Sequence, residues 1–109
     1  MGADSRDIWV VMVTAPNQEE ADKIADLAVG SHQAACATTI PLAHSTYWWE
    51  GKLVKEQETM VLLKTTADKF QTLQETIKKA HSYKVPEIIA VPVMAGLPQY
   101  LEWVRKETS

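Results

Sequence analysis

The sequence predicts an α+β domain in which two helices pack on one face of a four-stranded antiparallel sheet and a short helix follows at the C-terminal end. Three observations favour this class. Short apolar runs alternate with segments whose apolar residues recur every three or four positions. Residues 46–66 have the pattern of a long β-hairpin that turns at Glu50-Gly51-Lys52. The 109 residues are enough for one compact domain and too few for two, so 1–109 is expected to be a single domain.

The first predicted strand covers residues 7–14. It is a continuous apolar run that Pro16 closes, as expected of a central buried strand. Asn17 can cap the helix predicted over 18–29, and Glu20 is placed to reach back to it in a capping box. The apolar face of this helix consists of Ala21, Ile24, Ala25 and Ala28.

The second and third strands form the hairpin. Small residues at 34–40 begin the second strand, which we expect to be an inner strand with Cys36 as a small buried hydrophobe. Pro41 cannot donate to a strand ladder and predicts a bulge before the aromatic arm. Residues 59–63 of the third strand are apolar on both alternating sets, so both faces of that strand should be covered. The charged residues Lys55, Glu56 and Glu58 are most simply a solvated strand edge.

The remaining elements complete the order. Thr65 or Thr66 can cap a second helix, whose apolar stripe is Phe70, Leu73, Ile77 and Ala80. A loop precedes a fourth strand at 87–94, which Pro92 places at an edge or a bulge. Pro98 suits the first turn of the last helix. Strand, helix, two strands, helix and strand in this order predict a ferredoxin-like βαββαβ sandwich with a C-terminal helix.

Two helices can cover only one face of such a sheet. The other face of residues 59–63 and the aromatic hairpin arm are left without a partner inside the chain. Oligomerisation is the simplest cover, because a large exposed apolar patch is unusual for a monomer. The residues expected at the interface are Tyr47, Trp48 and Trp49.

Composition excludes several classes of protein. Charged residues make up 23% of the chain and hydrophobic residues 46%, as in an ordinary globular protein. A net charge of -3 gives no basic footprint for nucleic acid, and no apolar run is long enough to span a membrane. Residues 1–6 lack the apolar core of a signal peptide and are expected to be flexible. With a single cysteine and therefore no internal disulfide, we expect a cytoplasmic protein.

Six motifs resemble the CutA divalent-cation tolerance proteins in order and spacing. They are VVMVTAP at 10–16, AACA at 34–37, YWWEGK at 47–52, LKTT at 63–66, HSYKVPEII at 81–89 and YLEW at 100–103. The resemblance spans about residues 8–105. It implies a ferredoxin-like subunit in a tight homotrimer, similar in architecture to the PII signalling proteins. It also implies a link to tolerance of copper and other divalent metals.

The copper ligands proposed within that family carry over only in part. They are a cysteine in the first strand and two adjacent histidines after the second helix, and the matching positions here are Val13 and Ala80-His81. Only His81 therefore remains as a candidate metal ligand, and His32 and His44 lie too far away in the sequence for a structural zinc site. An ordinary loop histidine is the alternative for His81. No cofactor is required, and weak binding of copper or another divalent metal is the open possibility.

The candidate cleft residues are polar or aromatic groups near predicted strand and helix ends. They are Lys64, Glu87, Tyr83, His81, Trp49 and Glu50. The resemblance implies that these positions line a cleft between subunits of the trimer. A buried ion pair of Lys64 with Glu87 that fixes subunit register is the structural alternative to a ligand site.

Three functions remain open. Our main hypothesis is a homotrimeric module associated with divalent-cation tolerance, which binds a small ligand or ion in its inter-subunit clefts. The second is a purely structural or partner-anchoring trimer. The third is an enzyme that uses Lys64, Glu87, His81 and Tyr83 for acid–base chemistry. No nucleophile elbow, phosphate loop or carboxylate pair is present, so we predict that the protein is not an enzyme.

Overall fold

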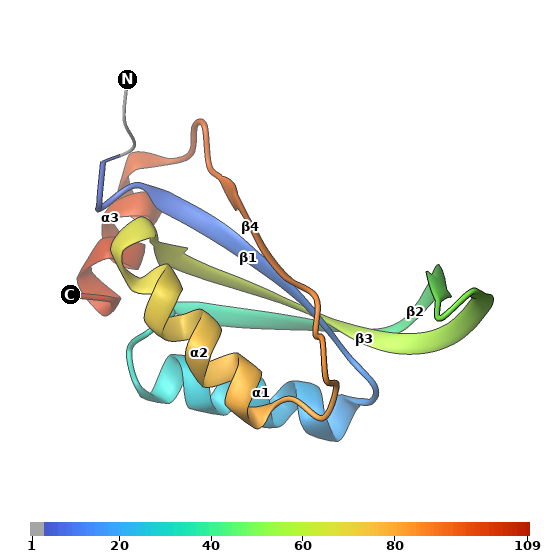
Figure 1. Ribbon diagram of the computed structural model, residues 1–109. Coiled ribbons are helices and arrows are strands. Elements are labelled where there is room, and N and C mark those ends of the chain that lie inside the picture. Colours follow the sequence, from blue (N-terminus) through green and yellow to red (C-terminus); the bar gives the residue numbers. More distant parts are fainter. Residues whose placement is uncertain (1–3) are drawn as a thin grey trace.

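Four antiparallel strands form one sheet in the order β2-β3-β1-β4 (Figure 1). The computed structural model describes residues 4–109; residues 1–3 of the N-terminal segment expected to be flexible lie outside them. The strands are β1 (Ile8–Ala15), β2 (Cys36–Trp49), β3 (Lys52–Thr66) and β4 (Ile88–Pro92). The helices are α1 (Gln18–Gly30), α2 (Phe70–Ala80) and α3 (Pro98–Glu107), and a 3-10 turn, η1 (Ala67–Lys69), precedes α2. The predicted α+β order is confirmed, including the edge position of the strand that carries Pro92.

The core lies between one face of the sheet and the helices α1 and α2 (Figure 1). Pairing of β1 with β3 sets Val11 opposite Leu63 and Val13 opposite Val61, and all four side chains are fully buried. The helices supply Ala21, Ile24, Ala28, Leu73 and Ile77. Burial of each Val, Leu or Ile side chain contributes about 1.5–3 kcal/mol, so this face holds the main part of the folding energy.

The opposite face of the sheet is apolar and open. Its large apolar side chains are Val10, Met12, Ile40, Met60, Leu62, Ile89 and Val91. They alternate with the core residues, and Met12 pairs with Leu62 on one side and with Ile89 on the other. Ile89 is 50% exposed. Helix α3 covers only one end of this face, where Ile8 and Val104 are buried together. The prediction that β3 is apolar on both sides is confirmed, and one chain alone leaves one of these sides uncovered.

The β2-β3 hairpin extends far beyond the other strands (Figure 1). Strand β1 ends at Ala15, opposite Thr59, so β2 and β3 pair only with each other from that point to the turn. Glu50 and Gly51 form the two-residue turn. Their φ angles are 48° and 76°, so both residues have the left-handed conformation typical of tight hairpin turns. The bulge predicted at Pro41 is confirmed by a register shift between Ile40 and Ala43.

The prediction that Cys36 lies on an inner strand is wrong. Strand β3 pairs with β1 on its second side, which leaves β2 at an edge of the sheet. Cys36 is half-buried, and its sulfur lies 3.5 Å from the Tyr100 hydroxyl of α3. This hydrogen bond and burial raise the pKa of Tyr100 to about 12.

Two predicted caps differ in detail. The Asn17 side chain accepts a hydrogen bond from the Glu20 amide at 2.8 Å, as expected of an N-cap. The reciprocal half of the capping box is wrong, because the Glu20 carboxylate accepts hydrogen bonds from Ser82 instead. Thr66 precedes η1 without a side-chain cap, and its hydroxyl donates to Asp68.

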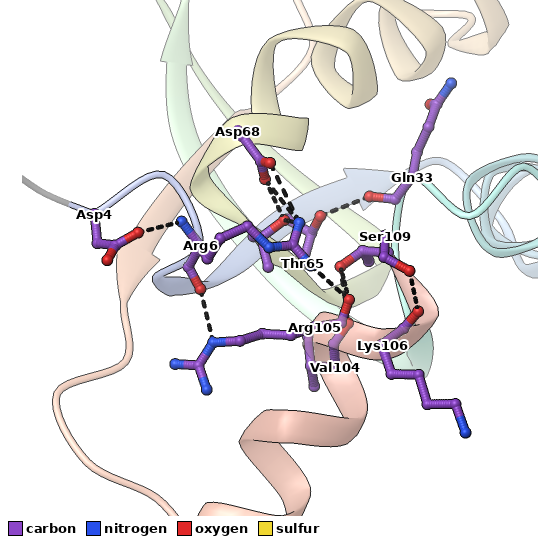
Figure 2. A network of polar contacts seen from close by, with 11 residues as sticks. Asp4, Arg6, Gln33, Thr65, Asp68, Val104, Arg105, Lys106 and Ser109 are labelled. Atoms are coloured by element: carbon purple, nitrogen blue, oxygen red, sulfur yellow. Dashed lines mark hydrogen bonds and ion pairs between the residues drawn. The ribbon is translucent and has the colours of Figure 1, made fainter.

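Arg6 ties the start of the described chain to its last helix (Figure 2). Its guanidinium donates to the Arg105 carbonyl oxygen and to Thr66 and Asp68, and the Arg105 side chain donates back to the Arg6 carbonyl oxygen. Burial alone would raise the pKa of Asp68, but hydrogen bonds from Thr66 and Arg6 lower it overall. Arg6 therefore has an anionic partner at neutral pH.

We expect Arg6→Ala to lower the free energy of unfolding by about 1–3 kcal/mol, because charged hydrogen bonds between distant segments are lost. Hydrogen exchange of the α3 amides should become faster. Lys106→Ala is the matched control, since Lys106 is exposed and its side chain makes no hydrogen bond within residues 4–109. Equal exchange of α3 in the two variants would contradict a clamping role for Arg6.

Candidate ligand cleft

A cleft of about 830 Å³ lies at the base of the hairpin. It opens where β1 ends. From the hairpin turn to Glu58, β3 has no strand neighbour on the side of β1, and the loop at 81–87 lies near this end of β1. The lining residues come from β1, from both hairpin arms and from this loop: Thr14, Ser45, Thr46, Tyr47, Trp49, Val54, Glu56, Glu58, Ser82, Tyr83, Lys84, Val85, Pro86 and Glu87. Three separate parts of the sequence thus build one site.

Two tyrosine–carboxylate pairs stand in this cleft. The Tyr83 hydroxyl donates to Glu58 at 2.8 Å, and the Tyr47 hydroxyl donates to Glu56 at 2.8 Å. Glu56 and Glu58 are two residues apart on β3 and therefore project from the same face. Glu58 is only 5% exposed, whereas Glu56 is exposed. Within residues 4–109, neither carboxylate forms an ion pair.

The carboxylates change the titration of both phenols. Burial, the hydrogen bond to Glu58 and its negative charge raise the pKa of Tyr83 far above the ordinary 10.0. The hydrogen bond to Glu56 is the main cause that raises the pKa of Tyr47. Both phenols therefore stay protonated at neutral pH and act as donors to the carboxylates.

His81 and Glu20 hold the loop that carries Tyr83. The buried imidazole uses both nitrogens: Nε2 lies 2.7 Å from the Thr14 carbonyl oxygen, and Nδ1 accepts the Tyr83 amide at 3.0 Å. The Thr14 carbonyl can only accept, so Nε2 carries the proton in this arrangement. The Glu20 carboxylate accepts the amide and hydroxyl of Ser82, at 3.1 and 3.0 Å. The loop is thereby attached to β1 and to α1.

The structure brings together only some of the predicted cleft residues. Trp49, Tyr83 and Glu87 line the cleft. His81 lies behind the wall as a positioning group, and Glu50 is in the exposed hairpin turn. Lys64 is six residues beyond Glu58 on β3, roughly 20 Å at 3.3 Å per residue, and pairs with Val10 and Cys36. A single chain therefore does not assemble the Lys64 and Glu87 pair.

Sequence reasoning missed Glu58, and the interpretation of Glu58 as part of a solvated edge is wrong. A usable signal was present, because Glu58 alternates with Met60 and Leu62 and must share their face. Glu20 was assigned to its own helix cap, since a contact with Ser82 across 62 positions leaves no local pattern. Of the residues expected at an interface, Tyr47 and Trp49 line the cleft and Trp48 is 72% exposed.

Metal-binding groups are dispersed in the described part of the chain. Within residues 4–109, no three His, Cys, Asp or Glu side chains are grouped so that they could hold a metal ion. His81 has no free ring nitrogen unless a hydrogen bond to Thr14 or Tyr83 breaks. None of the described helices is both long and apolar enough to cross a membrane.

Comparison with known proteins bears on this architecture. The profile of the CutA1 divalent ion tolerance protein family matches residues 9–107. The chain belongs to the CutA1 family. It is 42% identical over 99 residues to the divalent-cation tolerance protein CutA of Thermus thermophilus, with 91% of this chain and 96% of the relative covered. It is 44% identical over 95 residues to the CutA protein of Escherichia coli, with 87% and 85% covered.

Solved CutA1 structures have the same fold. CutA of Xylella fastidiosa superposes with a TM-score of 0.92 at 38% identity, covering 94% of this chain and 99% of that one. The Thermus thermophilus CutA1 structure gives a TM-score of 0.91 at 41% identity, with 94% and 99% covered. The resemblance expected from the six motifs is thus confirmed, and so is the fold class. A relative from Archaeoglobus fulgidus is described as a periplasmic divalent cation tolerance protein.

The phenol titrations give a direct test of the two pairs. A raised pKa stabilises the folded state below the ordinary 10.0, and this contribution is lost as pH rises through the higher folded-state value. We expect Glu58→Gln to bring the pKa of Tyr83 down toward 10.0, because the carboxylate charge is removed. Phenolate absorbance measured against pH checks this shift. Glu75→Gln on the exposed side of α2 is the control and should leave the curve unchanged.

Proposed function

We propose that the chain works as a homotrimer associated with divalent-cation tolerance and binds a small ligand or cation in the cleft at the base of each hairpin. The observation that carries the assembly is the open apolar face, where Ile40, Ile89 and Val91 are 44%, 50% and 43% exposed. Burial of apolar surface contributes about 25 cal/mol per Å², so a face of this kind favours association. The number of three subunits rests on the resemblance to the CutA family.

The projecting hairpin supports the same assembly. Among the described strands, residues 43–58 pair only with the opposite hairpin arm, and Trp48 and Leu53 near its tip are 72% and 55% exposed. An aromatic arm of this length is suited to lie against a neighbouring subunit. The cleft would then open next to a subunit contact, where small-molecule sites are common.

The names of the relatives and the acidic lining of the cleft support the proposed role in divalent-cation tolerance. Glu56, Glu58 and Glu87 line the cleft against a single cation, Lys84. Binding of copper or another divalent metal would be weak, because no preformed cluster of ligands exists within residues 4–109. We place the protein in the cytoplasm, where its single cysteine, Cys36, would stay reduced.

A structural or partner-anchoring trimer is the second candidate, because association through the open face alone would satisfy it. Native mass spectrometry of the protein purified from its own cells separates the two. A trimer with a retained small molecule or metal supports the binding module. A trimer that remains bare supports the structural role, and a monomer contradicts both.

We expect Ile89→Lys to convert the trimer to monomers without unfolding the chain. Ile89 lies on the open face and is 50% exposed in one chain. A lysine there is compatible with the folded monomer, but its charge would oppose burial of the face between subunits. Leu27→Lys is the matched control on α1, where the leucine is 44% exposed and lies away from the open face. Sedimentation equilibrium measures the mass of each variant. A trimer that withstands Ile89→Lys would place the interface elsewhere.

A further inference from the structure

The cleft contains a carboxylate oxygen to which no residue of 4–109 donates a hydrogen bond. Glu58 is 5% exposed, and its Oε2 accepts the Tyr83 hydroxyl at 2.8 Å. Its second oxygen, Oε1, accepts no hydrogen bond from residues 4–109, although Glu58 lines the cleft. No Lys, Arg or His of these residues forms an ion pair with Glu58. A carboxylate that lines a cleft and has no cationic partner among these residues favours a positively charged ligand.

The remaining walls define the kind of cation. Tyr47, Trp49 and Tyr83 place three aromatic side chains around the cleft, and Val54, Val85 and Pro86 add apolar surface. Aromatic faces attract ammonium and guanidinium groups, and apolar walls pack against a carbon skeleton. A bare divalent metal uses neither kind of wall and requires several oxygen ligands at 2.3–2.6 Å or less. No such group of ligands exists among the described residues.

The phenols add directionality. Because Tyr47 and Tyr83 donate their protons to Glu56 and Glu58, their hydroxyl oxygens present lone pairs to the cleft. Carboxylate and phenol oxygens together form an acceptor-rich surface, which suits a ligand that donates several N–H bonds. Lys84 is the one cationic side chain in the lining, against three carboxylates.

We propose that the cleft binds a small organic cation, with a primary ammonium or guanidinium group held by Glu58 and its carbon skeleton packed against Tyr83 and Tyr47. This inference rests on the proposed function, since it names the class of ligand for the same cleft. The carboxylates of Glu56 and Glu58 and the phenols of Tyr47 and Tyr83 all come from one chain. A neighbouring subunit would add walls at the mouth of the cleft.

Isothermal titration of the intact protein with putrescine tests the proposal. Succinate is the matched probe, because it has the same number of carbon atoms and carries two negative charges in place of two positive ones. We expect binding of putrescine and none of succinate. Glu58→Gln keeps an acceptor for Tyr83 but removes the charge, and it should weaken putrescine binding by about ten- to a hundredfold. Glu75→Gln, an equal change of charge on exposed α2, should leave binding unchanged.

Several results would overturn the proposal. An unaltered affinity of Glu58→Gln for putrescine would overturn it. A trimer that binds succinate or Cu²⁺ but not putrescine would also overturn it, but would leave the proposed function intact. Dissociation of the Glu58→Gln trimer into folded monomers would show that a neighbouring subunit supplies the missing cation. A wild-type monomer that binds none of the three probes would contradict the proposed function itself. If Glu58→Gln fails to fold, Glu56→Gln at the exposed carboxylate serves as the second variant and should weaken binding by a smaller factor.

Discussion

Pairing of β1 with β3 determines almost everything else in this fold. Its register sets Val11 opposite Leu63 and Val13 opposite Val61, and these residues form the surface on which α1 and α2 pack. A shift by one residue would turn the core side chains to the open face, so the buried face holds the register in place. The same alternation leaves Met12 and Leu62 on the side that no helix covers, apart from the end under α3. One pairing thus produces both a closed core and an unfinished face.

The cleft follows from the unequal lengths of these two strands. Strand β3 continues beyond the end of β1, and residues 82–87 of the following loop line the cleft beside it. That loop is not free, because His81 links it to the Thr14 carbonyl and Glu20 holds Ser82. The cleft wall is therefore connected to the core through hydrogen bonds. A polar site could form here without a break in the sheet.

The sequence predicted the fold well because its signals are local. Asn17 marks the start of α1, Gly51 marks the hairpin turn, and Pro41 marks the bulge, each through the backbone of its immediate neighbours. The edge position of Cys36 was mispredicted, because strand order depends on which partner β3 selects and not on the composition of β2.

The site was less predictable than the fold, because its contacts join residues that are far apart in the sequence. Tyr83 and Glu58 are 25 positions apart, and their contact depends on where β1 stops. Lys64 and Glu87 were grouped because both lie near strand ends, but these ends belong to different parts of the sheet. Motif resemblance proposed Tyr83 and Trp49 for a cleft between subunits, and both line the cleft of the single chain, whereas the contribution of Glu58 required the three-dimensional arrangement.

The two prolines of the sheet bear on how a newly made chain avoids aggregation. Pro41 interrupts β2 and Pro92 ends β4, and these are the two edge strands. A proline has no backbone N–H, so a ladder to a further chain would be broken at each of these positions. Until the open apolar face is covered, a free chain exposes both apolar side chains and unpaired strand edges. This combination favours the growth of fibrils. Its edges are poor templates for such growth at the time when the chain is most exposed.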